Sequence, residues 1–232
     1  MVLSRLDIVK DFIDYLTTEY NKEVYRILRE NNSPKEIFDC WEWRERNYFK
    51  TTSGSDEYLL SDSFIGSIMY EYEQNNYYQK GYSIECGAEQ IAFIFSDEVY
   101  KISSNDTGGL VNNFICSLNN RFTDLFLYCD YLGFYKDCYI YKQTRVEEPL
   151  CSEDYINKAK AKGVDFNPDY YYEIRSEGCR ALIAIEYGED FLAELCESLA
   201  DSGFNFDIHS DNYGIGTGGW VKIFDPIYTE EN

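Results

Sequence analysis

Histidine is almost absent from this sequence, with His209 the single example among 232 residues. Eight cysteines are present, but they are scattered and form no Cys-x-x-Cys pair. Because zinc sites are built from closely spaced Cys and His ligands, the sequence argues against a zinc site. We expect free thiols in a reducing cytoplasm at the eight positions, which are Cys40, Cys86, Cys116, Cys129, Cys138, Cys151, Cys179 and Cys196.

Long apolar runs are also lacking. No run approaches the roughly 20 apolar residues that a membrane-spanning helix needs. The first residues, Met-Val-Leu-Ser-Arg-Leu-Asp-Ile-Val-Lys-Asp, are too charged for a signal peptide. The sequence also contains no internal repeat and no low-complexity tract. We therefore expect a cytoplasmic protein that makes no membrane contact.

Basic residues are scarce relative to acidic ones. Lys and Arg number 21 against 42 Asp and Glu, which gives a net charge of -21. A protein that binds nucleic acid passively must neutralise phosphates, so we expect no direct nucleic-acid partner. Acidity of this size keeps a protein soluble and can also attract basic proteins. Apolar residues make up 44% of the chain, enough to bury about 70% of the unfolded surface in one large domain or two small lobes.

Residues 1–80 read as a helical N-terminal extension. Apolar residues recur at steps of three and four from Leu6 to Tyr20, which predicts an amphipathic helix that residues 21–31 either prolong or follow with a second helix. The sequence Ser33-Pro34-Lys35-Glu36 is a capping box that starts another helix. A polar loop over 44–58 and a helix through Phe64, Ile68 and Tyr72 follow. We expect this part to support packing.

Residues 81–145 read as a β-rich lobe. Short β-rich runs cover 82–86, 90–95 and 99–103, and the last two are separated by the turn-like Ser96-Asp97-Glu98. A short helix over 108–118 follows, and two more strands are predicted at 125–131 and 138–143. The buried face of the helix is expected to comprise Leu110, Phe114, Ile115 and Leu118.

Residues 146–232 read as a short helical lobe. A helix over 153–162 ends at Gly163, and a second helix carries Phe191 to Leu199 and ends at Gly203. The residues between them, 168–174 and 179–185, are helical or mixed. The second helix leads the chain directly into the sequence Phe204-Asn205-Phe206-Asp207.

Several chemically capable residues stand at a meaningful spacing after this helix. The sequence Phe-Asp-Ile-His-Ser-Asp-Asn runs from Phe206 to Asn212, and Phe-Asp-Pro follows at 224–226 after a Val-Lys-Ile-Phe strand. A short loop can hold Asp207 and Asn212 together while a hairpin returns Asp225. Two metal-binding oxygens and a proton-accepting carboxylate can then converge on one phosphate. By composition alone, residues 207–219 also fit a polar turn without catalysis.

These residues resemble the catalytic and metal-binding loops of the protein-kinase-like superfamily, in the variant Asp-x-His-x-x-Asn. Within it, the two motifs look most like the early host-takeover protein kinases of short-tailed coliphages. A strand with a single lysine, Lys101, after a glycine-containing hairpin is similar to the nucleotide-binding part of kinases. The resemblance implies an α+β, two-lobed kinase-like fold. Because the chain ends soon after Asp225, the catalytic lobe is expected to be minimal and truncated.

The resemblance also implies roles for individual residues. Asp225 is the main Mg²⁺ ligand and Asn212 the second, while Asp207 accepts or orients the substrate hydroxyl. Lys101 holds the α- and β-phosphates of ATP, and Gly87 belongs to the glycine-containing roof over the nucleotide. His209 is expected to brace the loop, and Asp211 matches no ligand of the family.

The sequence departs from the kinase pattern at three places. The roof offers only Gly81 and Gly87 rather than a close glycine triplet. The third motif is Phe-Asp-Pro, which suggests a fixed metal loop. Residues 108–120 contain no acid to pair with Lys101, so the substitutes are Glu71, Glu73, Glu85 or Glu89.

The leading hypothesis is therefore an ATP- and Mg²⁺-dependent Ser/Thr protein kinase that a phage uses early in infection to modify host proteins in the host cytoplasm. One alternative is a pseudokinase or acidic, DNA-mimic-like inhibitor that binds a basic host nucleic-acid enzyme or toxin. A third is a small-molecule kinase. The sequence leaves the phosphate acceptor and the oligomeric state open.

Overall fold

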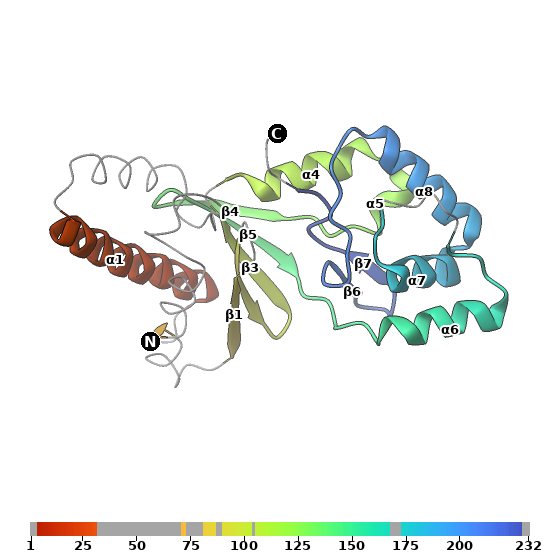
Figure 1. Ribbon diagram of the computed structural model, residues 1–232, viewed down its shortest axis with the longest axis horizontal. Helices are drawn as coiled ribbons and strands as arrows, with labels where there is room; N and C mark the ends of the chain where they lie inside the picture. The colour runs from red at the N-terminus through yellow and green to blue at the C-terminus, as the bar shows by residue number, and fades with distance from the viewer. Residues whose placement is uncertain are drawn as a thin grey trace. The chain divides into compact units, whose positions relative to one another are not determined.

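In the computed structural model, the chain is described for residues 4–31, 71–72, 81–86, 90–103, 105–167 and 173–228. It divides into two compact units, of which the first comprises Met1–Asp106 and Asp130–Gln143 and the second Thr107–Cys129 and Thr144–Asn232. Helices and strands occur in both units (Figure 1). The predicted α+β class is confirmed at this coarse level.

The first unit is built on a five-stranded sheet with strand order β1-β2-β3-β5-β4. The pairs β1–β2, β2–β3 and β4–β5 are antiparallel. The first three strands match the predicted β-rich runs closely, because alternating apolar residues specify strands locally. The strands are β1 (Tyr82–Cys86), β2 (Ile91–Phe95), β3 (Glu98–Ser103), β4 (Asp130–Tyr135) and β5 (Cys138–Thr144).

Helix α1 (Arg5–Asn31) forms one core with this sheet, and residues 21–31 prolong the predicted N-terminal helix. Phe12 is fully buried, and its ring lies 5.1 Å from that of Phe93 on β2 and 5.0 Å from that of Tyr72. The helical periodicity of the apolar residues therefore marks the face that packs on the sheet. The buried residues of α1 are Val9, Phe12, Ile13 and Leu16.

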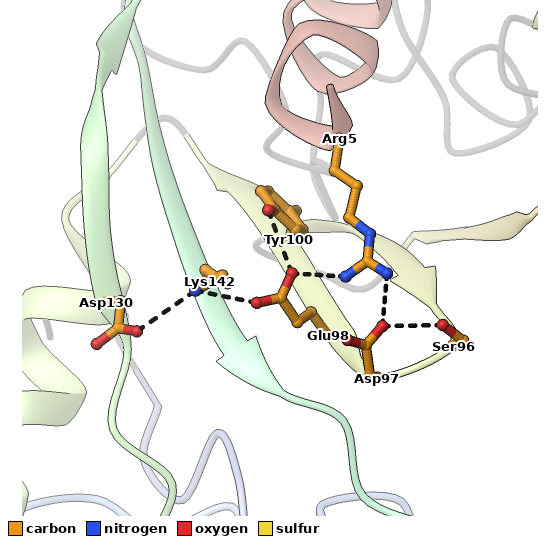
Figure 2. Close-up of polar contacts among 7 residues, drawn as sticks. All are labelled: Arg5, Ser96, Asp97, Glu98, Tyr100, Asp130 and Lys142. Carbon is orange, nitrogen blue, oxygen red and sulfur yellow. Dashed lines mark hydrogen bonds and ion pairs between the residues drawn. The ribbon is translucent and has the colours of Figure 1, made fainter. Parts of the chain in front are cut away.

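An ionic network joins the start of α1 to the sheet (Figure 2). Arg5 contacts Asp97 at 2.5 Å and Glu98 at 2.6 Å, at the turn between β2 and β3. Glu98 also contacts Lys142 of β5 at 3.0 Å, and its other oxygen lies 3.3 Å from the hydroxyl of Tyr100. The network therefore ties one helix and two strands together at the surface of the unit.

The strand predicted at 125–131 is wrong. Strand β4 begins at Asp130, and it is joined to β5 by a two-residue turn in which Lys136 and Asp137 have φ values of 47° and 63°. The apolar residues at 125–127 follow α5 through a turn, and Phe126 forms a parallel bridge with Ile223. Leu127 N donates to Ile223 O at 2.9 Å, and Ile223 N donates to Leu125 O at 2.7 Å.

The predicted helix at 108–118 is present as α4 (Thr107–Ser117), within the second unit. Phe114 and Ile115 are fully buried and Leu118 is 6% exposed, as expected. Leu110 is 39% exposed, so its predicted place on the buried face is wrong. The buried face is completed instead by Val111, one residue further along the helix.

The remaining helices of the second unit are α5 (Asn120–Thr123), α6 (Ser152–Lys162), α7 (Glu177–Tyr187) and α8 (Glu189–Asp201). The predicted helix at 153–162 is confirmed as α6. The predicted helix that carries Phe191 to Leu199 is confirmed as α8. Gly163 ends α6 with φ 68°, where a side chain would be strained. Gly203 follows α8 with φ 75° and turns the chain toward Asp207.

A two-stranded sheet of β6 (Tyr213–Ile215) and β7 (Val221–Ile223) completes the second unit. The predicted strand at 221–224 is thus confirmed as β7. Strand β6 also pairs with the segment after β5, since Glu147 and Ile215 exchange backbone hydrogen bonds of 2.8 and 2.9 Å. Gly214 permits this approach because a Cβ at that position would fall 2.7 Å from the Glu147 oxygen.

The predicted capping-box helix at 33–41, the loop at 44–58 and Gly87 fall outside the described residues. Glu71 and Tyr72 are helical, in line with the helix predicted through Tyr72. Across the described part of the chain, none of the helices is both long and apolar enough to cross a membrane.

Candidate functional site

Two chain segments run side by side at the candidate site. Phe206 and Ile227 form an antiparallel bridge, and Asp207 N donates to Pro226 O at 2.9 Å. The segment that follows α8 is thereby aligned with the segment that follows β7. This pairing brings Asp207 and Asp225 into one region of the second unit.

Asn212 links the two segments through its side chain. Its amide nitrogen donates to the backbone oxygen of Asp207 at 2.7 Å and to that of Asp225 at 3.2 Å. Its backbone oxygen accepts from Phe224 N at 3.0 Å. The three residues that the motifs single out are therefore joined by direct hydrogen bonds.

These bonds also settle how the Asn212 amide is oriented. Both acceptors are carbonyl oxygens, so the group that faces them must be the NH₂ end. The carbonyl end, Oδ1, is the end left to bind another group. Amide and carboxylate oxygens are the ligands that Mg²⁺ takes, and two of them suffice because the ion keeps several waters. Asn212 and Asp225 are thus chemically suited to hold Mg²⁺.

Asp225 has an unusual backbone conformation, with φ 47°. Left-handed φ values are strained for most side chains but are tolerated by Asp and Asn. The conformation is maintained on both sides, since the Asp225 oxygen accepts from Asn212 and the Pro226 oxygen from Asp207. A strained residue that is held from both sides is characteristic of functional loops.

His209 is arranged as a brace within the loop. The backbone N–H of Asp211 donates to Nδ1 of His209 at 3.2 Å. Nε2 lies 3.6 Å from the Asp207 carboxylate. His209 N also donates to the Asp207 backbone oxygen at 3.0 Å. Asp211 itself is exposed, with 84% of its side chain accessible.

Arg175 lies beside both the Asp207 carboxylate and Tyr228, and no sequence motif pointed to either Arg175 or Tyr228. Arg175 Nη1 lies 4.0 Å from Asp207 Oδ1 and donates to the Tyr228 hydroxyl at 2.8 Å. The nearby Asp207 carboxylate raises the pKa of the Tyr228 hydroxyl. Asp207 is therefore flanked by a cation, an imidazole and a phenol.

The loop rests on a segment that precedes α7. Ile174 and Ile208 form a parallel bridge, and Arg175 N donates to Ile208 O at 2.9 Å. Arg180 of α7, which is 8% exposed, donates to the Ile174 oxygen at 2.6 Å and to the Phe166 oxygen at 3.2 Å. The buried guanidinium therefore fixes the backbone that carries Arg175.

Aromatic packing supports the loop from α4. The ring of Phe114 lies 5.6 Å from that of Phe206 and 5.3 Å from that of Phe204, with edge-to-face geometry in both pairs. Phe114 is fully buried. Packing of this kind adds to the energy of burial and holds the residue before Asp207 in place.

Lys101 belongs to the first unit, on β3. Its neighbours Tyr100 and Ile102 are in the core that includes α1, so Lys101 points to the opposite face of the sheet. It is 7% exposed, and its register partner on β2 is Ala92, which also pairs with Glu85 on β1. Lys101 and Glu85 therefore share one sheet face with a small residue between them.

Of the other acidic residues predicted to pair with Lys101, only Glu71 is among the described residues. Glu71 accepts a hydrogen bond from the Tyr15 hydroxyl at 3.4 Å, within the first unit. Glu73, Glu89 and Gly87 lie outside the described residues.

The second unit also contains a hollow that lies apart from this site. A hollow of about 630 Å³ opens between the end of α4, α5 and α8, and none of the predicted site residues lines it. In the part of the chain that is described, no group of three or more His, Cys, Asp or Glu side chains is placed to hold a metal. Asn212 and Asp225 are fewer than such a group requires, and one of the two offers an amide oxygen rather than a carboxylate.

Comparison with protein-family models, with curated proteins and with solved structures gives no match for this chain.

Proposed function

We propose that this chain is a minimal ATP- and Mg²⁺-dependent protein kinase that transfers phosphate to Ser or Thr hydroxyls of host proteins. The observation that carries the proposal is the Asn212 side chain, which is bonded to the backbone of both Asp207 and Asp225. A base and two metal ligands held in one place are what phosphoryl transfer requires of a protein.

The first unit supports the same proposal. A hairpin followed by a third strand with one buried lysine is similar to the nucleotide-binding part of protein kinases. In this proposal Lys101 holds the α- and β-phosphates. Mg²⁺ bound by Asn212 and Asp225 would neutralise the charge of the phosphates. Asp207 accepts the proton of the acceptor hydroxyl, and Arg175 and His209 hold its carboxylate.

The restriction to host proteins and to the early phase of a phage infection rests on the resemblance alone. The cytoplasmic location rests on the scattered cysteines and on the charged N-terminal residues.

The test is transfer of labelled γ-phosphate from Mg-ATP, to the protein itself and to a host lysate. Asp207→Asn is expected to lower the rate by about 10² to 10⁴, and Lys101→Met is expected to abolish transfer. Asp225→Asn is preferred to Asp225→Ala, because Asn tolerates the φ of 47° and removes only the charge.

Matched controls separate loss of chemistry from loss of fold. Asp211→Asn changes an exposed carboxylate of the same loop, and Asp137→Asn changes a residue with a similar φ of 63°. Both are expected to retain transfer. Absence of label with the unchanged protein, together with no thermal shift on adding ATP and Mg²⁺, would contradict the proposal.

The net charge of -21 favours one second candidate, an acidic inhibitor of a basic host nucleic-acid enzyme or toxin. Binding driven by charge weakens steeply as salt is added and tolerates Asp225→Asn. A kinase loses activity on that substitution at every salt concentration. Measuring both responses on the same preparation therefore distinguishes the two functions.

A further inference from the structure

An aromatic row leads from the interior of the second unit to its surface. The rings of Phe122 on α5 and Phe191 on α8 lie 5.2 Å apart, and Phe191 stacks on Tyr187 of α7 at 4.7 Å. Tyr187 in turn lies 5.7 Å from Trp220, which directly precedes β7. Phe122 and Phe191 are buried, whereas Trp220 is 50% exposed. The row therefore ends in an indole that is accessible to solvent.

The buried end of the row binds a cation of the chain itself. The Arg121 guanidinium lies 5.1 Å from the ring centroids of both Phe122 and Phe191, and it pairs with the Glu194 carboxylate. Aromatic rings beside a carboxylate thus hold a guanidinium in this unit. Tryptophan is the best ring for such a contact, and among the described residues no cation lies over Trp220.

The exposed end of the row also has a carboxylate beside it. Glu186 Oε2 accepts at 3.0 Å from the backbone N–H that follows Trp220. Lys222 also acts on Glu186, but its ammonium group donates to the Asp124 backbone oxygen. Burial, together with the charges of Glu186 and Asp124, raises the pKa of the Tyr187 phenol. The exposed ring pair therefore lies in a negative potential, which favours a cationic partner.

The hollow between the end of α4, α5 and α8 continues the row, because Arg121 and Phe122 are among its lining residues. Helix α8 adds the carboxylates of Glu194, Glu197 and Asp201 to the lining. Residues three or four apart lie on one helix face with about 5–6 Å between their Cβ atoms, so these carboxylates form a line. In the described part of the chain, no basic side chain pairs with Glu197 or Asp201.

We propose that the hollow and Trp220 together form a docking surface for an extended, basic segment of a protein partner. Arginine or lysine side chains of the segment pair with Glu197 and Asp201 and cover the Trp220 ring. Alternate side chains of an extended segment point to one side and lie about 6.6 Å apart, close to the spacing of the carboxylates. Such docking requires no nucleotide and is independent of phosphoryl transfer.

The charge of the chain selects this occupant over a second copy of the chain. With 42 acidic and 21 basic residues and a net charge of -21, two copies repel each other, whereas a basic segment is attracted. The carboxylates of the hollow outnumber its single guanidinium by three to one, so the local charge has the same sign as the net charge.

The probe is a fluorescein-labelled peptide of about eight residues, about 26 Å long when extended, in which arginine alternates with glycine. It is titrated into the full chain by fluorescence anisotropy at about 0.15 M salt, which screens distant charges. Trp220→Ala is expected to weaken binding by about 3- to 30-fold. Trp220→Phe keeps a ring and is expected to retain most of the affinity. Tyr128→Ala, the matched control, removes a tyrosine that is 46% exposed in the same unit and is expected to change little.

A second pair of variants separates the hollow from the general attraction of an acidic protein. Glu197→Gln and Glu153→Gln each remove one negative charge from an exposed helical position of the second unit. Glu197→Gln is expected to weaken binding by about two- to fivefold, and Glu153→Gln is expected to leave it nearly unchanged. Equal effects of the two variants, or no effect of Trp220→Ala, would show attraction by net charge alone and overturn the inference.

The place of binding is read from the indole N–H signal of Trp220 in nitrogen-15 NMR, assigned by its loss in Trp220→Phe. The basic peptide is expected to shift this signal, and binding that leaves the signal unmoved overturns the inference. A proline-rich peptide that shifts the signal at lower concentration than the basic peptide assigns the surface to another class of partner. Self-association that Trp220→Ala abolishes, measured by sedimentation, assigns it to a second copy. Either result also overturns the inference.

Discussion

The side-chain nitrogen of Asn212 lies 2.7 Å from the backbone oxygen of Asp207, which stands five positions earlier in the chain. The same nitrogen reaches the Asp225 oxygen, so Asn212→Ala removes two hydrogen bonds and leaves two carbonyls without this donor. We expect a loss of about 1–3 kcal/mol in the free energy of unfolding, measured by urea denaturation.

The control for this prediction is Asn205→Ala, an exposed asparagine of the neighbouring segment. It is expected to change stability by less than about 0.5 kcal/mol. Equal effects of the two substitutions would mean that the Asn212 side chain does not join the two loops in solution.

Removal of the Phe12 side chain tests whether α1 is part of the first unit's core. Phe12 is fully buried against Phe93 and Tyr72, so Phe12→Ala leaves a cavity and is expected to cost about 3–5 kcal/mol. Thr18→Ala, at an exposed position of the same helix, should have little effect. Thermal unfolding of the two variants provides the comparison, and a negligible effect of Phe12→Ala would show that α1 does not pack on the sheet.

The ionic network at the start of α1 predicts a loss of stability in acid. The hydrogen bond from Lys142, with that from Arg5, holds the pKa of Glu98 below its ordinary value of 4.5. A lowered carboxyl pKa stabilises the fold above the unfolded-state pKa, and that contribution disappears as pH falls from 4.5 through the folded-state pKa. We expect Glu98→Gln to flatten this part of the stability–pH curve.

Glu148→Gln is the control for this pH dependence, because Glu148 is an exposed glutamate that takes no part in the network. It should leave the slope unchanged. Denaturation midpoints recorded between neutral pH and the acid limb measure the slope, and identical curves for the unchanged protein and Glu98→Gln would refute the role of the network.

Thiol labelling is expected to divide the cysteines into two classes. The six whose side chains are described are all free, and only Cys116 and Cys151 are exposed. Burial raises the pKa of Cys138 to about 12 and that of Cys196 to about 12, so both thiols are poorly ionised at neutral pH. In native protein, iodoacetamide should therefore modify Cys116 and Cys151 first. Equally fast modification of Cys138 would show that the first unit's core is open.

The sequence by itself determined those elements whose signals are local. Helix α6 follows from helical periodicity, and its end follows from the glycine at position 163. The structure shows why glycine is suited there, since Gly163 has φ 68°. The first three strands follow from apolar alternation between turn residues. The Asp207, Asn212 and Asp225 set was likewise identifiable, because the motif residues and their spacing are visible in the chain.

Only the tertiary structure decided what depends on distant partners. Residues 125–127 look like a strand of the large sheet, yet they pair with Ile223, nearly a hundred residues later in the chain. Arg175 reaches Asp207 and Tyr228 because Ile174 pairs with Ile208 and Phe206 pairs with Ile227. Apolar pattern and residue type state a segment's preference for strand or helix. They do not state which segment it meets, because that choice minimises the energy of the whole packed unit.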